Sequence, residues 1–321
     1  MSWRIYDPRN PVSDESRQRW LKKAPPWRCP QAVPNVEREV PAPKPHEQRG
    51  RNYVSSSLFR QEGEEGPDEA DRINIALLVR RPLLVTGDPG IGKSSLAYHL
   101  AHVLRLGAVL RWEINSRTTL ADGLYSYDAV DHLRAIKEQG ESGIADFIHL
   151  GPLGTALLPT AEPRVLLVDE LDKSSYDLPN DLLHVFEEGA FRVDELARSD
   201  GTELVWPSDC GGESDRVPIS GGRVRTHHHP VVVITSNKER EFPPAFLRRC
   251  VQLELRRPTG AHLHRIVQQQ LGDVVSEEEI ASLLHEHPDQ ATDVFLQALF
   301  LNAGHGAPVE DAMQSLKRDR R

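Results

Sequence analysis

The sequence predicts an α/β fold in which a mostly parallel sheet, flanked by helices, is followed by a small all-helical domain. Apolar runs without alternation, such as 165–168 and 231–235, are typical of parallel strands that are buried on both faces. A glycine-rich turn joins the apolar run 83–86 to a segment with helical spacing. After Arg257 and Pro258 only helical patterns follow, at about 259–271, 276–286 and 290–303.

The composition fits one large or two modest globular domains, because 38% of the 321 residues are hydrophobic and 27% are charged. A net charge of -9 argues against a general binder of nucleic acid or of anionic membranes. The three cysteines have no metal-ligand spacing, which favours a reducing compartment. No stretch approaches the roughly 18 apolar residues of a membrane span. We therefore expect a cytoplasmic protein.

The α/β part opens with a helix between Pro67 and Arg81, where apolar residues recur at helical spacing and Pro82 ends the pattern. The strand 83–86 follows, and the β-rich run 108–114 predicts a second strand. Shorter patterns predict a helix at about 131–138, a strand at 147–150, a helix at 177–188 and the start of a hairpin at 190–193.

The segment from about 197 to 222 is rich in Gly, Ser and Asp, and it predicts a surface loop. After the strand 231–235, one helical turn at 245–249 leads into a strand at 251–255. Residues 1–50 hold nine of the 24 prolines and predict an extended arm, with Trp3, Trp20 and Trp27 as candidates for docking on another surface; a disordered tail is the alternative. The expected domains are thus the arm 1–50, the α/β domain 51–257, and the helical domain with a frayed basic tail 258–321.

The glycine-rich turn has the spacing of a nucleotide phosphate loop, since Gly87 is followed after four residues by Gly92, Lys93 and Ser94. Glycines allow the backbone to curl so that its N–H groups face anionic oxygens. We expect Lys93 to contact the β- and γ-phosphates of ATP and Ser94 to bind Mg²⁺. The alternative, an ordinary turn between strand and helix, is disfavoured by the flanking patterns. The expected nucleotide-binding residues are Gly87, Asp88, Pro89, Gly90, Ile91, Gly92, Lys93, Ser94, Ser95 and Asp169.

Polar side chains end the two longest apolar strands. Asp169 and Glu170 follow the run 165–168, at the edge where open α/β sheets bind ligands. We expect Asp169 to hold Mg²⁺ through water and Glu170 to polarise the attacking water; a solvated acidic turn is the alternative. Asn237 follows the run 231–235, and its amide either orients the same water or caps a turn.

These features, together with an Arg-Arg turn and a C-terminal helical lid, resemble the AAA+ ATPases in the same order over about residues 70–303. The segments 151–153, 182–189 and 234–237 look most like the MoxR-type branch, which is related to the dynein-like AAA domains. The resemblance implies a P-loop NTPase core with a helical lid, assembly into a hexameric ring, and a partner protein with a von Willebrand factor A domain.

The resemblance also implies individual roles. Lys93 and Ser94 match Walker A, Asp169 and Glu170 match Walker B, and Asn237 matches sensor 1. Arg249 best matches the arginine finger that acts on a neighbouring subunit. Arg248 and Arg249 are otherwise ordinary surface charges. The segment 286–293, where a sensor 2 arginine often lies, contains no arginine, so lid-coupled sensing of the γ-phosphate is in doubt.

Three functions are compatible with this sequence. The leading one is a ring-forming remodelling or chaperone-like ATPase, which the intact Glu170 favours. The second is a nucleotide-binding switch or scaffold with little hydrolysis, which the missing sensor 2 arginine favours. The third is a DNA-associated motor, which the acidic composition disfavours.

Overall fold

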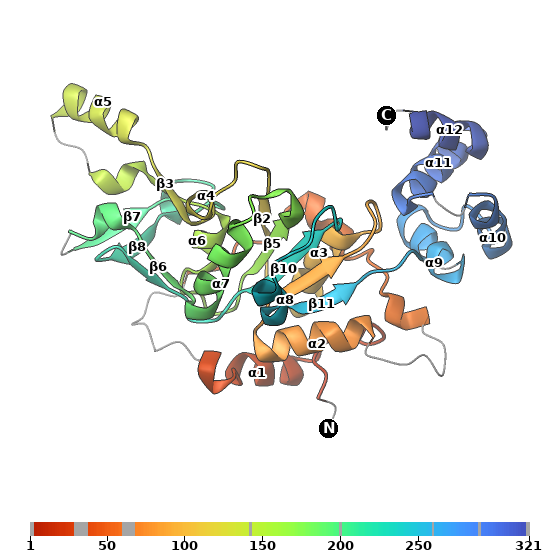
Figure 1. The fold of residues 1–321 in the computed structure, drawn as a ribbon, viewed down its shortest axis with the longest axis horizontal. Helices are drawn as coiled ribbons and strands as arrows, with labels where there is room; N and C mark the ends of the chain where they lie inside the picture. The colour runs from red at the N-terminus through yellow and green to blue at the C-terminus, as the bar shows by residue number, and fades with distance from the viewer. Residues whose placement is uncertain are drawn as a thin grey trace.

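A computed structural model describes residues 3–28, 38–59, 68–140, 143–198, 201–258, 260–287 and 290–318. Its centre is a five-stranded, entirely parallel sheet with the order β11-β1-β10-β5-β2 (Figure 1). The predicted α/β class and parallel sheet are therefore confirmed. The strands are β1 (Leu83–Thr86), β2 (Leu110–Glu113), β5 (Val165–Asp169), β10 (Val231–Ser236) and β11 (Val251–Glu254).

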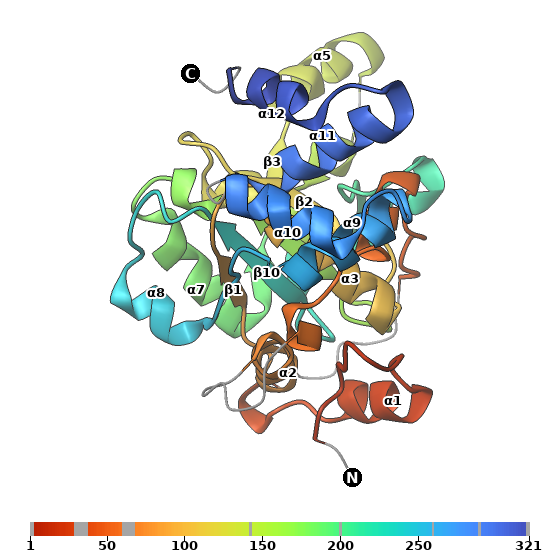
Figure 2. The same ribbon diagram turned by 90° about the vertical axis from the view of Figure 1, so that its right-hand side faces the viewer.

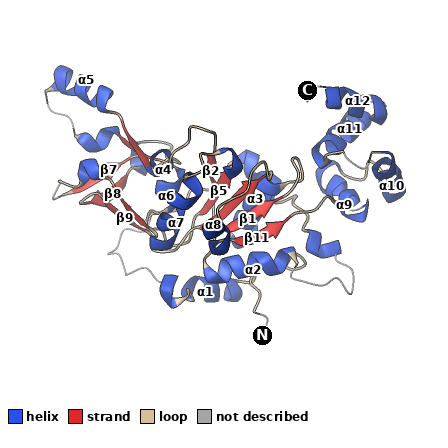
Figure 3. Ribbon diagram, in the orientation of Figure 1, coloured by secondary structure: helices blue, strands red, loops and turns tan. Residues whose placement is uncertain are grey.

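Helices cover both faces of this sheet, as the secondary-structure colouring shows (Figure 3). Because successive side chains of a strand point to opposite faces, Leu83 and Val85 pack into one apolar cluster and Leu84 into another. The first cluster includes α2 (Glu69–Val79) and α3 (Lys93–Leu104). The second includes α6 (Pro152–Ala156), α7 (Leu178–Glu188) and α8 (Pro244–Arg249).

Because the strands are parallel, their carboxyl ends lie at the same edge of the sheet. Val85 lies opposite Thr235, and Asp169 lies opposite Glu113. The residues that follow β1, β5 and β10 therefore converge, although they are far apart in the chain. Short 3₁₀ turns complete the connections: η1 (Pro26–Arg28), η2 (Pro45–Gly50), η3 (Ser56–Phe59), η4 (Ile144–Phe147), η5 (Leu171–Lys173), η6 (Asp194–Leu196) and η7 (Glu213–Asp215).

Two insertions extend the core at the end away from the lid (Figure 1). The first carries α4 (Leu120–Leu124), the paired strands β3 (Tyr125–Tyr127) and β4 (Ile148–Leu150), and the outstretched α5 (Ala129–Gln139). The second is an antiparallel sheet of β6 (Ala190–Arg192), β7 (Thr202–Val205), β8 (Val217–Ser220) and β9 (Arg223–Arg225).

The second insertion corrects the prediction of a surface loop over 197–222. Residues 202–205 and 217–220 pair as antiparallel strands within that segment. Val205, Val217 and Ile219 are buried and belong to the main apolar cluster. The Gly, Ser and Asp residues that favour a loop lie almost entirely before, between and after the two strands, so they dominate the composition of the segment and obscure two short strand patterns.

The lid consists of α9 (Gly260–Leu271), α10 (Glu277–Glu286), α11 (Thr292–His305) and α12 (Val309–Arg318), and it faces the viewer in Figure 2. It has its own apolar cluster, which includes Leu263, Phe295 and Met313. The sequence predicts a frayed tail from Lys317, but Lys317 and Arg318 belong to α12, which buries Met313; residues 319–321 lie outside the described part. No helix in the described residues is long and apolar enough to cross a membrane.

The N-terminal arm packs on the core instead of running along it as a purely extended segment. Residues 14–22 form helix α1 (Asp14–Lys22), which lies beside α2 in both Figures 1 and 2. Trp20 is 1% exposed and donates from Nε1 to the carbonyl of Leu77 at 2.9 Å. The guanidinium of Arg80 stacks on its ring at 4.3 Å. Of the three arm tryptophans, Trp20 is therefore the one that docks, and it docks within the same chain.

We expect Trp20→Ala to lower the free energy of unfolding by about 3–5 kcal/mol, the usual cost of removing a buried tryptophan from a packed site. The substitution also leaves the Leu77 carbonyl without its indole donor. Trp27→Ala is the matched control, since Trp27 is 75% exposed. Urea unfolding followed by circular dichroism checks this, and equal midpoints for the two variants would show that the arm does not stabilise the core.

Candidate functional site

The phosphate loop connects β1 to α3, and the ammonium of Lys93 points toward the backbone of this loop. Gly92 is the N-cap of α3 with φ of 91°, a left-handed conformation that favours glycine. The ammonium of Lys93 donates to the carbonyls of Gly87 at 2.9 Å and Asp88 at 2.7 Å. Burial lowers the pKa of Lys93, and the nearby carboxylates oppose this shift. The ammonium is therefore held at the mouth of the loop with weak carbonyl partners, which phosphate oxygens can replace.

Asp169 is the centre of a hydrogen-bond cluster at the end of β5. Its Oδ1 accepts from Ser94 Oγ and from Thr235 Oγ1, each at 2.7 Å. Its Oδ2 accepts from the Arg111 guanidinium at 3.1 and 2.8 Å. Burial by itself would raise the pKa of Asp169, but the hydrogen bonds from Ser94, Thr235 and Arg111 hold it below its usual range. The carboxylate is thus ionised and directed at the start of α3.

Glu170 and Asn237 face each other beside this cluster. Glu170 has φ of 61°, in the left-handed region that non-glycine residues seldom adopt, and its N–H donates to Thr235 Oγ1 at 2.8 Å. Asn237 Nδ2 lies 3.5 Å from Glu170 Oε1, and Lys173 Nζ lies 2.6 Å from Oε2. Backbone strain of this kind clusters at functional sites. The arrangement holds an acid and an amide where they can contact one water.

Asp172 fixes the position of the loop that carries Asn237. It is 4% exposed, and its Oδ2 accepts from the backbone N–H of Asn237 at 2.8 Å and of Glu239 at 3.1 Å. The strand β5 and the loop after β10 are therefore joined by one buried carboxylate. Sequence reasoning missed this residue, as it missed Thr235 and Arg111. The only sequence signal for Asp172 is that it lies three residues after Asp169.

These groups fit a magnesium nucleotide. A curled backbone with an inward lysine suits phosphate oxygens, and a hydroxyl beside a carboxylate (Ser94 and Asp169) is the oxygen donor set that Mg²⁺ prefers. When bound, the metal ion neutralises charge on the phosphates. Lys93 would contact the phosphates, Ser94 and Asp169 would hold the metal, and Glu170 with Asn237 would orient a water.

Comparisons with known proteins agree with this geometry. The family model for the AAA domain of the dynein-related subfamily matches residues 82–250, which is just over half of the chain. The chain belongs to this AAA family. Members of the AAA+ family generally bind ATP with Mg²⁺ and commonly form oligomeric rings. No curated protein matches the sequence.

Solved structures share distant similarity with this AAA protein. The Holliday junction branch migration motor RuvB of Thermotoga maritima is 14% identical, with a TM-score of 0.38 over 74% of this chain and 61% of that chain. A point mutant of the same motor is 16% identical, with a TM-score of 0.41 over 74% of this chain and 63% of that chain. The AAA protein thus spans less than two thirds of the length of these structures.

The phosphate loop of the AAA protein contacts the segment after β11 and the lid. Arg257, after β11, pairs with Asp88 at 2.6 Å. A Cβ added to Gly90 would lie 2.3 Å from Oδ1 of Asp293, so this carboxylate lies directly against the loop. Asp293 belongs to the segment 286–293, where a sensor 2 arginine often lies. The lid therefore presents negative charge to the phosphate loop.

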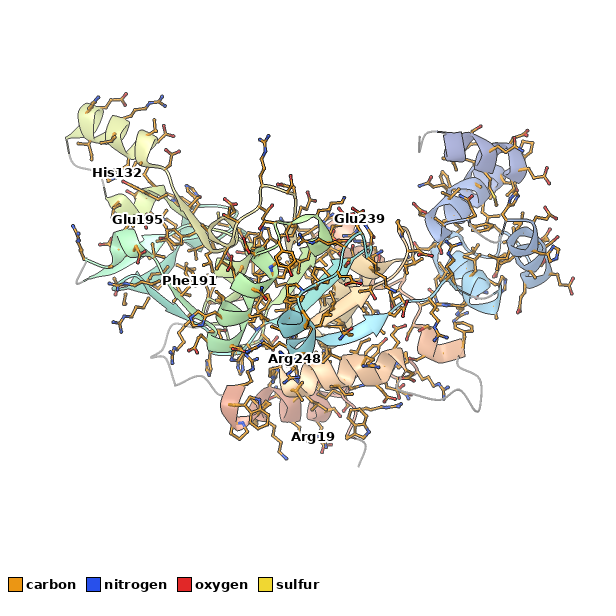
Figure 4. All side chains as sticks on the ribbon, in the orientation of Figure 1. Arg19, His132, Phe191, Glu195, Glu239 and Arg248 are labelled. Carbon is orange, nitrogen blue, oxygen red and sulfur yellow. The ribbon has the colours of Figure 1, made fainter. Side chains whose placement is uncertain are left out.

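The two arginines of α8 differ in their surroundings. Arg249 Nε pairs with Glu187 Oε1 of α7 at 2.5 Å within the same chain. Arg248 is exposed on α8 (Figure 4), and its side chain makes no ion pair with any residue that the structure describes. Neither guanidinium bonds to the phosphate-loop cluster of its own chain. Of the predicted site residues, Gly87 to Ser95, Asp169, Glu170 and Asn237 are thus brought together, and Arg248 and Arg249 lie elsewhere.

Proposed function

We propose that this AAA protein binds and hydrolyses ATP with Mg²⁺ and acts as a ring-forming, MoxR-like remodelling or chaperone-like ATPase. The observation that carries the proposal is the convergence of Ser94, Asp169, Glu170 and Asn237 at one edge of the sheet. Glu170 acts as the base toward water, Asn237 orients that water, and Lys93 stabilises charge on the transferred phosphoryl group. The same proposal divides the chain into the arm 1–50, the nucleotide-binding domain 51–257 and the lid 258–321.

The arginines of α8 support a shared site between copies of the chain. Because they lie away from the phosphate loop of their own chain, they are available to a neighbour in a ring. Arg248 is exposed, whereas Arg249 would have to leave Glu187. We propose that α8 supplies the arginine that completes the neighbouring site, in a hexamer or a similar closed ring.

The finer assignment rests on the resemblance to the MoxR-type branch. It leads us to propose a partner with a von Willebrand factor A domain and a reducing, cytoplasmic setting. The alternative is a nucleotide-binding switch with little hydrolysis. The segment 286–293 favours this alternative, because it places the carboxylate of Asp293, and no arginine, against the phosphate loop, so this segment supplies no guanidinium to the charge that develops during hydrolysis.

Complementation between variants tests the shared site. Arg248→Ala/Arg249→Ala is expected to bind ATP and to lose about 10³- to 10⁵-fold in turnover, the usual range for donated arginines. Mixed with Glu170→Gln, it should regain part of the parent activity, because some interfaces then combine an intact Glu170 with an intact α8. Phosphate release and light scattering are measured on each variant and on the mixture.

The single substitutions Arg248→Ala and Arg249→Ala show which guanidinium is used. A mixture that stays as inactive as its components, although exchange into mixed oligomers is demonstrated, contradicts the shared site. If the parent also binds ATP without turnover at any protein concentration, the switch is the better description.

A further inference from the structure

Arg111 is an arginine inside the nucleotide site that the proposed chemistry does not use. It lies on β2, the edge strand next to β5, where its register partner is Leu167 and that of Glu113 is Asp169. Residues 111 and 113 share one face of β2, since side chains two apart point the same way. Trp112 between them is buried on the opposite face.

The Arg111 guanidinium bridges two carboxylates of different exposure. It donates to Oδ2 of Asp169 at 2.8 Å and lies 2.9 Å from Oε1 of Glu113. The Asp169 side chain is 7% exposed, whereas that of Glu113 is 71% exposed. A guanidinium presents several donors in a rigid fork, so it can hold both acids together. Arg111 is thus a cation shared between an inner and an outer acid.

This contact occupies the carboxylate that the metal needs. Oδ1 of Asp169 is engaged by Ser94 and Thr235, and Oδ2 is engaged by Arg111. A metal ion, or a water bound to it, must therefore compete with the guanidinium for Asp169. The two cations also repel each other, because both would lie against the same carboxylate. Glu113 offers the guanidinium a partner that it already contacts.

We propose that Arg111 is an internal counter-cation that neutralises Asp169 in the metal-free site and moves onto Glu113 when Mg²⁺ and nucleotide enter. Arg111 then sets the metal affinity of the site, because only the fraction of molecules with a released Asp169 binds the ion. Glu113 increases that fraction by holding the guanidinium away. This inference rests on the proposed function, in that it takes the site to bind a magnesium nucleotide.

The test measures Mn²⁺ binding by electron paramagnetic resonance in the presence of a non-hydrolysable ATP analogue. Arg111→Gln is expected to tighten Mn²⁺ binding about tenfold, since the competitor is removed. Glu113→Gln is expected to weaken it several-fold, because Arg111 then stays on Asp169. Arg134→Gln on α5 is the control for loss of an exposed charge, and it should bind Mn²⁺ as the parent does.

The double variant Arg111→Gln/Glu113→Gln separates this switch from a simple change of net charge. If Glu113 acts only through Arg111, the double variant binds Mn²⁺ as tightly as Arg111→Gln alone. If the two effects add and cancel, so that the double variant matches the parent, the switch is wrong. Unchanged Mn²⁺ affinity in Arg111→Gln overturns it as well. Arg111→Lys, which keeps the charge but loses the fork, should fall between Arg111→Gln and the parent.

Nucleotide binding is measured in the same samples with a fluorescent ATP analogue, both in EDTA and with Mg²⁺. A parent protein that binds no nucleotide under either condition contradicts the proposed function itself. If the parent binds nucleotide and Mn²⁺, but these affinities are the same in the Arg111 variants, only the inference about Arg111 is contradicted.

Discussion

Glu170→Gln is expected to bind magnesium ATP with the affinity of the parent and to lose about 10²- to 10⁴-fold in turnover, the usual contribution of a positioned general base. The amide keeps the size of the side chain and can still contact Asn237, but it cannot accept a proton from water. Ground-state contacts to the phosphates come from the loop and Lys93, so the affinity does not depend on residue 170.

Glu188→Gln is the matched control for Glu170→Gln. Glu188 is an exposed acid at the end of α7, so its replacement removes the same charge without touching the site. Nucleotide affinity is measured by fluorescence anisotropy and turnover by phosphate release. Parent-like turnover in Glu170→Gln would show that another group activates the water.

Lys93→Ala is expected to abolish detectable nucleotide binding at micromolar concentrations. Removing one partner of a desolvated charge pair costs about 2–5 kcal/mol, which corresponds to a loss of about 30-fold or more in affinity. The loop carbonyls of Gly87 and Asp88 also lose their ammonium donor, so the cradle itself is less ordered.

Lys137→Ala, on the outstretched α5, is the control for loss of a lysine. It should bind nucleotide as the parent does. Titration of a fluorescent ATP analogue compares the three proteins. A Lys93→Ala protein that binds within about threefold of the parent, a difference of less than 1 kcal/mol, would show that the phosphates are held elsewhere.

The sequence predicts well those features that depend on neighbouring residues. The phosphate loop, the apolar runs of β5 and β10, and the acids after β5 are local patterns, and each is found where the pattern puts it. The helical lid follows from periodicity alone. Its last helix, α12, is missed, although Val309, Ala312, Met313 and Leu316 recur at helical spacing there. The strands at 202–205 and 217–220 are missed because each is short and buries few apolar side chains, namely Val205 in the first and Val217 and Ile219 in the second.

Features that depend on the strand order are not predictable from the sequence in this way. Arg111 meets Asp169 only because β2 lies beside β5, and Thr235 meets it only because β10 lies on the other side. Asp172 acts through the backbone of a loop 65 residues away. Nor does spacing reveal that Arg249 is paired with Glu187 while Arg248 is exposed, because α7 and α8 are distant in the chain and close in the fold.

The decisive measurement for an ATPase at this site is the rate of phosphate release from ATP by the parent protein, compared with Lys93→Ala purified in the same way. We expect turnover by the parent that requires Mg²⁺, rises per subunit with protein concentration as rings assemble, and is absent in Lys93→Ala. A parent rate equal to that of Lys93→Ala at all protein and Mg²⁺ concentrations would contradict the assignment of this site as an ATPase.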